Sequence, residues 1–386
     1  MTMPIPLISQ DNASRVLAAA YGRYSNALAG TQVYSPCLLL ALPPTWNNRF
    51  QALLYEQAGL HQYITMGIGD PKILKHVSWP GPIVLHAHWF SSYFNNSQDE
   101  VEASARLDDL CEDILVFRAR TGAKLLWTAH NIFPHENRFP LVFLRLRQWI
   151  FENFDAVHVM QQEHVSVLET EFSRKAPTTF VVPHMLYSGS YPDGVSVKVA
   201  KNYYGIQPDE FVFGFFGSIQ PYKNLELFLS AFDQLQQKTQ RPIAAIVGGV
   251  PSDPETVLNL KQHWGMNSKV RLLMRIIPDH EIQYIHRAAD VMVFPYGETL
   301  NSGAAYMAVG FGHPVIMPDG MASRSLEGLG VVRFDSSMPD GLIRAMADVM
   351  NGKRGHYDKD ALAQLEPKVV SAKFFSALDQ VIGRKG

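Results

Sequence analysis

Polar and small residues at positions 301–303 stand where a helix should begin, between two apolar strand-like runs. Asn301 and Ser302 are residue types whose side-chain oxygens cap helix starts by accepting from free backbone N–H groups. Gly303 and the alanines after it leave that helix end uncrowded. A helix start carries unpaired donors and about half a positive charge, so it suits a phosphate group. The segment predicts an anion site; the alternative is an ordinary strand–helix–strand unit with a small-residue packing face.

A second anion-binding loop is predicted directly after the apolar strand at residues 211–216. Gly217 permits a ligand to approach the backbone closely, and Lys223 supplies a point charge suited to a diphosphate. The alternative for Lys223 is a solvated loop lysine. The loop at 295–303 should emerge at the same edge of a parallel sheet, which favours a shared anion site. Arg275, on the neighbouring loop, is a further candidate for diphosphate charge.

Polar residues also follow the apolar run at 124–128. His130 is the first of them, and we expect either His130 or Glu136 to orient or deprotonate a substrate hydroxyl. The alternative is that His130 only satisfies backbone groups at a strand end. Three further polar residues share this loop: Asn131, His135 and Glu136.

Three other histidines lie at predicted strand ends. His86 and His88 share one strand face by the two-residue period, which leaves a metal pair open, although no third ligand is evident. We also expect His88 on the same side of the site as His130. His184 follows a strand and a proline, where it either borders the site or simply packs.

Short apolar runs alternate with longer amphipathic segments along the whole chain. This alternation predicts an α/β fold with parallel sheets covered on both faces. The first half has predicted strands at 37–42, 83–86, 124–128, 156–160 and 179–182, and predicted helices at 15–24, 51–58, 101–120 and 139–154. The second half has predicted strands at 211–216, 243–247, 270–273, 291–294 and 315–317.

The composition of the sequence changes between residues 187 and 210. This stretch is rich in Tyr, Ser, Gly, Pro and Asp and has no strong hydrophobic periodicity. We interpret this stretch as a connection between two doubly wound, Rossmann-like domains that face a cleft. The predicted division is 1–195, 196–366 and a terminal helix at 367–386.

Composition excludes several classes of protein. The 386 residues carry a formal net charge of −2, which argues against a nucleic-acid binder. Cys37 and Cys111 are the two cysteines, so no disulfide framework is implied. The start lacks a signal-peptide pattern, and no apolar run approaches a membrane span, so we expect a cytoplasmic protein.

The predicted helix at 139–154 suggests how the protein could touch a membrane. Phe139, Phe143, Leu146, Ile150 and Phe154 form a core stripe at helical spacing. The residues off that stripe are partly basic and aromatic, and such a face can rest on anionic headgroups; the alternative is a solvated helix face. These outward-facing residues are Arg145, Arg147, Gln148 and Phe151.

The chain resembles family 4-like glycosyltransferases of the glycosyltransferase-B fold, of the bacterial polysaccharide-assembly type. Residues 217–223 match the family's Gly-Arg-x-x-x-x-Lys loop, and residues 295–315 match its donor-sugar segment. Weaker first-half matches lie at 85–89, 127–131, 154–158 and 182–184. The resemblance implies that Lys223 contacts a donor diphosphate and that Glu298 holds donor-sugar hydroxyls.

Two positions depart from the family pattern. Ser218 stands where the family has Arg, and Met307 stands where its second Glu would align. Met307 cannot accept hydrogen bonds from ribose hydroxyls, so these departures put donor identity in doubt.

The resemblance implies transfer of a hexosyl unit from a GDP- or UDP-sugar to a saccharide or polyprenyl-linked saccharide acceptor, for exopolysaccharide or surface-polysaccharide synthesis. It implies no cofactor, no metal and peripheral contact with the inner membrane surface. It also implies that the terminal helix at 367–386 crosses back to the first domain, and that His88, Asn131 and His135 lie on the acceptor side of the site. One alternative is a non-catalytic partner subunit of a glycosyltransferase complex, which the two departures favour. The other is a nucleotide-sugar epimerase of the same fold, which needs paired acid and base carboxylates.

Overall fold

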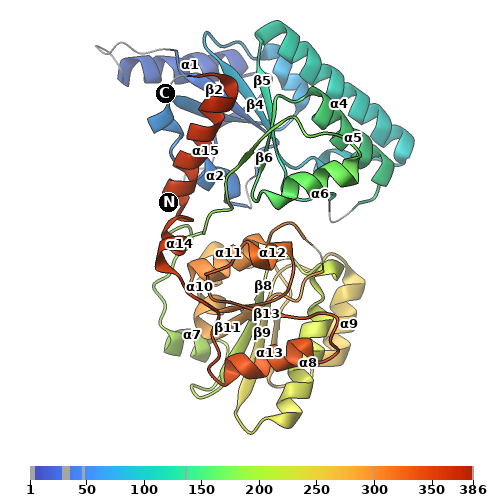
Figure 1. Cartoon of the computed structure of the whole chain (residues 1–386), viewed down its shortest axis with the longest axis vertical. Coiled ribbons are helices and arrows are strands. Elements are labelled where there is room, and N and C mark those ends of the chain that lie inside the picture. Colours follow the sequence, from blue (N-terminus) through green and yellow to red (C-terminus); the bar gives the residue numbers. More distant parts are fainter. Residues whose placement is uncertain (1–4, 28–34, 46–47, 135–136, 298, 385–386) are drawn as a thin grey trace. The chain divides into compact units, whose positions relative to one another are not determined.

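The computed structural model describes residues 5–27, 35–45, 48–134, 137–297 and 299–384. The chain divides into two compact units. The first unit comprises residues 2–185 together with 367–386, and the second comprises 186–366. Each unit is built on its own parallel sheet with helices on both faces, which confirms the predicted α/β class (Figure 1).

Seven strands of the described part form the sheet of the first unit, in the order β1-β3-β2-β4-β5-β6-β7, and every pair is parallel. Chain order reverses between β2 and β4, so ligands are expected at the carboxyl ends of those strands. The strands are β1 (Leu7–Ile8), β2 (Cys37–Leu42), β3 (Tyr63–Ile68), β4 (Ile83–Ala87), β5 (Lys124–Thr128), β6 (Ala156–Val159) and β7 (Thr178–Val181).

Two groups of helices cover this sheet. α4 and α5 pack on one face, while α2 and α15 lie together on the other (Figure 1). The α-helices are α1 (Ala13–Ala27), α2 (Phe50–Leu54), α3 (Ser91–Phe94), α4 (Glu100–Thr121), α5 (Pro140–Asn153), α6 (Glu163–Phe172) and α15 (Pro367–Ile382), and the 3₁₀ turns are η1 (Ala58–His61) and η2 (Pro71–His76).

The helix α15 completes the core of the first unit, although it follows the whole second unit in sequence. Phe374 and Phe375 are fully buried. The Ser371 hydroxyl donates to the Leu54 carbonyl at 2.7 Å, and Tyr63 donates to Asp379 at 2.7 Å. These contacts fix α15 against α2 and β3.

Six strands of the second unit follow the order β10-β9-β8-β11-β12-β13, again with every pair parallel. Chain order reverses between β8 and β11, which places the expected ligand crevice at their carboxyl ends. The strands are β8 (Phe211–Phe216), β9 (Ile243–Gly248), β10 (Val270–Leu273), β11 (Val291–Val293), β12 (Val315–Pro318) and β13 (Val331–Phe334).

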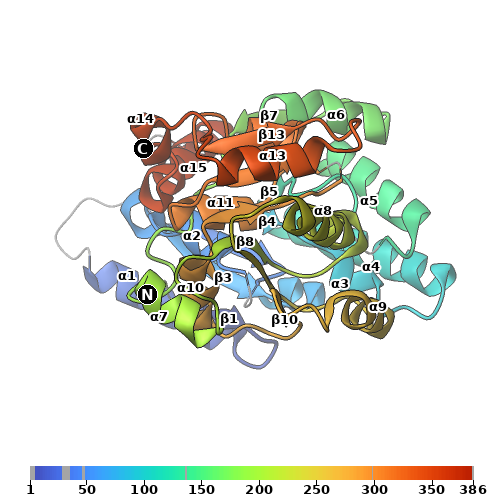
Figure 2. The same cartoon turned by 90° about the horizontal axis from the view of Figure 1, so that it is seen from below.

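Helices of the second unit cover both faces of its sheet. Figure 2 shows α8 and α13 side by side on one face. The helices are α7 (Val197–Tyr203), α8 (Leu225–Lys238), α9 (Pro254–Trp264), α10 (Asp279–Ala288), α11 (Gly303–Gly310), α12 (Met321–Arg324), α13 (Gly341–Met350) and α14 (Lys359–Ala363), with the 3₁₀ turn η3 (Pro221–Lys223). In the described ranges, no helix is both long and apolar enough to cross a membrane.

Buried strands are where the sequence-based expectations are most accurate. β2, β5, β8 and β10 have the predicted bounds. All six residues of β2 are buried, as a continuous apolar run in a parallel sheet requires. β1, β3 and β13 were not predicted. β3 contains Gly67, where an added Cβ would lie 2.8 Å from Pro44, so close packing rather than apolar periodicity selects that residue.

The prediction that four residues of 139–154 face outward is wrong for two of them. Arg147 and Phe151 are buried in α5, with 2% and 5% of their surface exposed. The Arg147 guanidinium lies 4.5 Å from the Trp127 ring, and Phe151 packs edge-on against Phe172 at 5.1 Å. Since α5 is covered by α6 as well as by the sheet, its buried face is wider than the predicted stripe.

The predicted helix at 51–58 is also only partly correct. α2 ends at Leu54, and Tyr55 has left helical geometry with φ −99° and ψ 9°. The chain then continues into the separate 3₁₀ turn η1.

Candidate functional site

The loop after β8 brings a buried lysine next to a glycine backbone. Gly217 has φ +131°, a conformation that favours glycine, and an added Cβ there would lie 3.1 Å from Lys223 Nζ. It would also lie 3.7 Å from the Cβ of Ala304, in the first turn of α11. Three elements that were predicted separately therefore meet at the carboxyl ends of β8 and β11.

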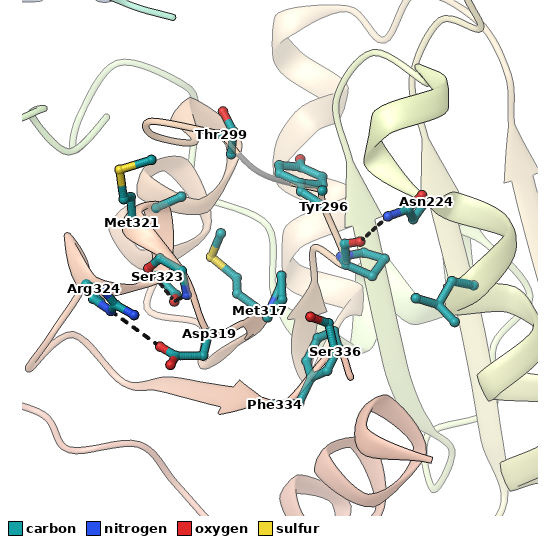
Figure 3. Close-up of a pocket in the computed structure, with 16 residues that line it drawn as sticks. Asn224, Tyr296, Thr299, Met317, Asp319, Met321, Ser323, Arg324, Phe334 and Ser336 are labelled. Carbon is teal, nitrogen blue, oxygen red and sulfur yellow. Dashed lines mark hydrogen bonds and ion pairs between the residues drawn. The ribbon is translucent and has the colours of Figure 1, made fainter. Parts of the chain in front are cut away.

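Two hydrogen bonds tie the loop after β8 to the loop after β11. The Gly297 N–H donates to the Tyr222 carbonyl at 2.7 Å, and the Asn224 side-chain amide donates to the Pro295 carbonyl at 3.0 Å. The second of these bonds is drawn in Figure 3. The position of Lys223 is thus set by both loops together.

Lys223 is placed where a positive charge has little solvation. Its side chain is 7% exposed, and the ammonium donates to Ser218 Oγ at 3.1 Å. It lies 5.3 Å from the ring centre of Tyr296. Burial lowers the pKa of Lys223 to about 8. Among the residues that the structure describes, no carboxylate forms an ion pair with it, so a bound anion would supply the missing counter-charge.

The start of α11 has the predicted cap. Ser302 is the N-cap residue, 5% exposed, and its Oγ accepts from the Ala305 N–H at 3.2 Å. Asn301 precedes the cap, and its carbonyl accepts from the Thr299 hydroxyl at 3.0 Å. Gly303 begins the helix, so its first turn presents backbone donors beside Lys223.

Other predicted residues of the second unit are placed differently. Arg275 follows β10, two strands from β8, and its guanidinium pairs with Glu281. Met307 is buried, with 8% of its surface exposed. Glu298 lies outside the described residues.

A cavity of about 530 Å³ opens beside the loop after β11. Gly297 lines it together with Tyr296 and Thr299 of the same loop, and residues at the ends of β12 and β13, among them Met317 and Phe334, complete the lining (Figure 3). Asp319 in its wall pairs with Arg324 at 3.6 Å. Gly217, Ser218 and Lys223 are not among its described lining residues, so the cavity is adjacent to the lysine rather than built around it.

Sequence reasoning missed Gly249 in this site. Gly249 has φ +155°, and an added Cβ would lie 1.8 Å from the Gly217 carbonyl oxygen. A side chain there would push the loop after β8 out of place. The signal in the sequence is the Gly248-Gly249 pair directly after a predicted strand.

The first unit contains the second predicted group of polar residues, around His130. The Trp89 ring stacks on the His130 ring at 3.6 Å with an interplanar angle of 18°, and His130 Nε2 lies 3.0 Å from His88 Nδ1. Burial, followed by the neighbouring His88, lowers the pKa of His130 well below its usual range. His130 is therefore neutral at pH 7, as a general base must be.

His86 and His88 do lie together, with ring centres 4.0 Å apart, but the Tyr55 hydroxyl bonds to both. It lies 2.7 Å from His86 Nδ1 and 2.7 Å from His88 Nε2. In the part of the chain that the structure describes, no group of three or more His, Cys, Asp or Glu side chains is arranged to hold a metal ion.

The structure also places two other polar residues that were singled out in the first unit, Asn131 and His184. Asn131 is half-buried in the loop after β5. His184 packs edge-on against Phe50 at 5.1 Å, and its Nδ1 donates to the Met185 carbonyl at 2.7 Å. His135 and Glu136 lie outside the described residues.

Buried Arg147 was not predicted as part of this site, yet it holds the loop that carries His130. Its Nε donates to the Ile132 carbonyl at 3.2 Å. Burial lowers the pKa of Arg147 to about 9. Within the described ranges its Nη1 has no hydrogen-bond partner.

Comparison with known proteins finds a family match within the second unit. Residues 210–351 match the family model of glycosyl transferases group 1. The chain is 25% identical over 236 residues to a GDP-mannose:glycolipid 4-beta-D-mannosyltransferase of Xanthomonas campestris, covering 61% of either chain. It is 27% identical over 177 residues to a D-inositol 3-phosphate glycosyltransferase of Corynebacterium efficiens, covering 44% of this chain and 41% of that one. The match thus spans under two thirds of either relative.

Solved structures with a similar fold cover nearly the whole chain. Sucrose-phosphate synthase from Thermosynechococcus elongatus superposes with a TM-score of 0.65 at 15% identity, covering 90% of this chain and 99% of that one. Anabaena HepE in complex with UDP-glucose gives 0.64 at 14% identity, covering 89% and 99%. At such identities the likeness is one of fold.

Proposed function

The chain has the glycosyltransferase-B fold with a glycosyl transferases group 1 domain at residues 210–351, and from this premise we propose that it transfers a hexosyl unit from a nucleotide-diphosphate sugar to a saccharide acceptor. The observation that carries the proposal is the meeting of Gly217, Lys223 and the start of α11. The site combines a buried ammonium group, a glycine backbone that a ligand can approach closely, and the free N–H groups of a helix start. Together these suit a diphosphate.

We assign the donor to the second unit. Lys223 and the first turn of α11 stabilise the charge that develops on the leaving diphosphate, and this arrangement needs no metal ion. Gly217 lets the phosphates lie against the backbone, Ser218 orients the lysine, and Asn301, Ser302 and Gly303 form the helix start. Glu298 would hold donor-sugar hydroxyls and Arg275 would add charge once released from Glu281.

We assign the acceptor to the first unit. The neutral His130 would orient the acceptor hydroxyl and take its proton, with Asn131, His135 and Glu136 on the same loop and His88 behind it. The name of the Xanthomonas relative includes a glycolipid acceptor. We extend this to a lipid-linked saccharide in surface-polysaccharide synthesis, met at the inner membrane surface by a cytoplasmic protein.

Calorimetric titration with GDP, UDP, ADP and dTDP tests the donor assignment. We expect one nucleotide, GDP or UDP, to bind at least tenfold more tightly than the others. Absence of binding to all four would overturn the proposal. GDP-mannose is the first sugar donor to test for turnover, given the named donor of the Xanthomonas relative.

A second candidate is a non-catalytic partner subunit. Ser218 in place of a basic residue and the buried thioether of Met307 in place of a carboxylate favour it, since each removes a contact that the family makes to its donor. Measurable turnover by the purified chain would exclude this candidate.

A further inference from the structure

A continuous series of hydrogen bonds links His130 to a backbone carbonyl through the interior of the first unit. It crosses the carboxyl ends of four neighbouring strands, β4 to β7. The successive contacts are His130 Nε2–His88 Nδ1 at 3.0 Å, His88 Nε2–Tyr55 Oη at 2.7 Å, Tyr55 Oη–His86 Nδ1 at 2.7 Å, His86 Nε2–Thr128 Oγ1 at 2.7 Å, Thr128 Oγ1–His158 Nδ1 at 2.9 Å and His158 Nε2–Val182 O at 2.9 Å.

The carbonyl of Val182 gives this series a direction. A carbonyl oxygen only accepts, so His158 must donate to it from Nε2. A neutral imidazole has one donor and one acceptor nitrogen, so Nδ1 of His158 accepts, and the donor is the Thr128 hydroxyl.

The same rule settles each following contact. Thr128 has used its one proton, so it accepts from Nε2 of His86, whose Nδ1 then accepts from the Tyr55 hydroxyl. Tyr55 in turn accepts from Nε2 of His88. Nδ1 of His88 is left as an acceptor, and His130 must donate to it from Nε2.

The three histidine rings must be neutral to donate and accept in this way, and burial keeps them neutral. His86, His88 and His158 are each at most 1% exposed. Burial lowers the pKa of His158 to about 4 and holds the pKa values of His86 and His88 well below the usual range. At pH 7 these three rings are uncharged.

We propose that this series of hydrogen bonds fixes His130 in the tautomer protonated on Nε2, so that any proton that His130 takes from the acceptor hydroxyl is added at Nδ1. Tyr55, Thr128 and His158 act as positioning residues, because they set the ring without touching substrate. The inference rests on the proposed function.

The chemistry balances in one step. The acceptor O–H bond breaks and an N–H bond forms at Nδ1 of His130, while the acceptor oxygen bonds to the anomeric carbon. The bond from that carbon to the phosphate oxygen breaks, and its electron pair leaves with the nucleoside diphosphate.

Tyr55→Phe tests the proposal, since it removes the one group that both accepts from His88 and donates to His86. His88 is then free to donate from Nδ1, which drives the proton of His130 to its own Nδ1. We expect the ¹⁵N shift of His130 Nδ1 to change from the unprotonated to the protonated range. Turnover should fall at least tenfold, with the KM for donor within about twofold of wild type, since a wrong tautomer costs a catalytic histidine up to on the order of 10⁴-fold.

Tyr63→Phe is the matched control. It removes another buried tyrosine hydroxyl of the same unit, one that bonds to Asp379 instead, and should leave the shift and turnover unchanged. If Tyr55→Phe fails to fold, Thr128→Val breaks the series with little change of shape, and Thr128→Ser should restore it.

Two results would overturn the proposal: a protonated His130 Nδ1 in the wild type, or an unchanged shift in both Tyr55→Phe and Thr128→Val. The proposed function fails separately. Normal turnover in His130→Ala would remove His130 from catalysis, whatever its tautomer. If instead the tautomer of His130 stays the same in the Tyr55 and Thr128 variants, His130 can still be required for turnover.

Discussion

Lys223 is the residue on which the donor assignment depends most, because its ammonium is buried without a described carboxylate partner. We expect Lys223→Met to weaken nucleoside-diphosphate binding at least tenfold, or about 1.4 kcal/mol. Calorimetry measures this. Lys261→Met is the matched control, since Lys261 is an exposed lysine of the same unit. Equal affinity of the Lys223 and Lys261 variants would remove Lys223 from the site.

The lowered pKa of Lys223 also predicts how binding depends on pH. Below about pH 8 the lysine of the free protein is charged and attracts the diphosphate; above that value it loses its proton. We expect affinity to fall as pH rises from 7.5 to 9.5. The Lys223→Met variant should lack this decline, and a wild-type affinity that stays level over the range would contradict the assignment.

Helix α10 contains a buried histidine that the proposed chemistry does not use. His286 is fully buried and stacks on Phe311 at 4.3 Å, and neither of its ring nitrogens has a partner among the described residues. An unsatisfied buried polar group costs about 1–3 kcal/mol. His286→Phe should therefore raise the melting temperature of the second unit.

The gain from His286→Phe should grow as pH falls. Burial holds the pKa of His286 well below its usual range. Below about pH 6.5 this histidine takes up a proton in the unfolded chain but stays neutral in the folded protein. The free energy of unfolding therefore declines as pH falls. Scanning calorimetry at pH 7.5 and 5.5 tests this, and an equal melting-temperature difference at both values would contradict it.

At the element scale, sequence periodicity works where burial is continuous and fails where one element has several neighbours. The strands β2 and β8 were predicted to the residue because both are almost wholly buried. Phe151 was misplaced because α6 covers a flank of α5 that a single apolar stripe cannot reveal. Arg147 was misplaced because its guanidinium lies over the Trp127 ring of β5. The cap at Ser302 was predictable because capping is a local hydrogen bond.

The candidate site was predictable one strand at a time. Gly217 and Lys223 stood out because their residue types and spacing already suit a phosphate. Tyr55, Thr128 and His158 did not stand out, because their roles depend on hydrogen bonds between residues 30 to 42 positions apart in the sequence. No window of sequence displays that series.

For the whole molecule, the first unit is the part made from two distant segments. We expect residues 1–185 alone to be unstable, because Phe374 and Phe375 of α15 would be missing from the core. Loss of a buried phenylalanine to alanine already costs about 3–5 kcal/mol. Circular dichroism melting of 1–185, with and without a peptide of residues 367–384, checks this. A cooperative melt of 1–185 with no gain from the peptide would contradict it.

The same division of the first unit has a consequence for synthesis on the ribosome. The sheet of the first unit emerges early, but α15 is translated only after all of residues 186–366. The second unit is continuous in sequence and can close as soon as it has been made, whereas the first must wait with an uncovered apolar face. The unit translated first is therefore the one that finishes folding last. Until α15 is made, the exposed core of the first unit could recruit chaperones or aggregate, and the length of the second unit sets the duration of that interval.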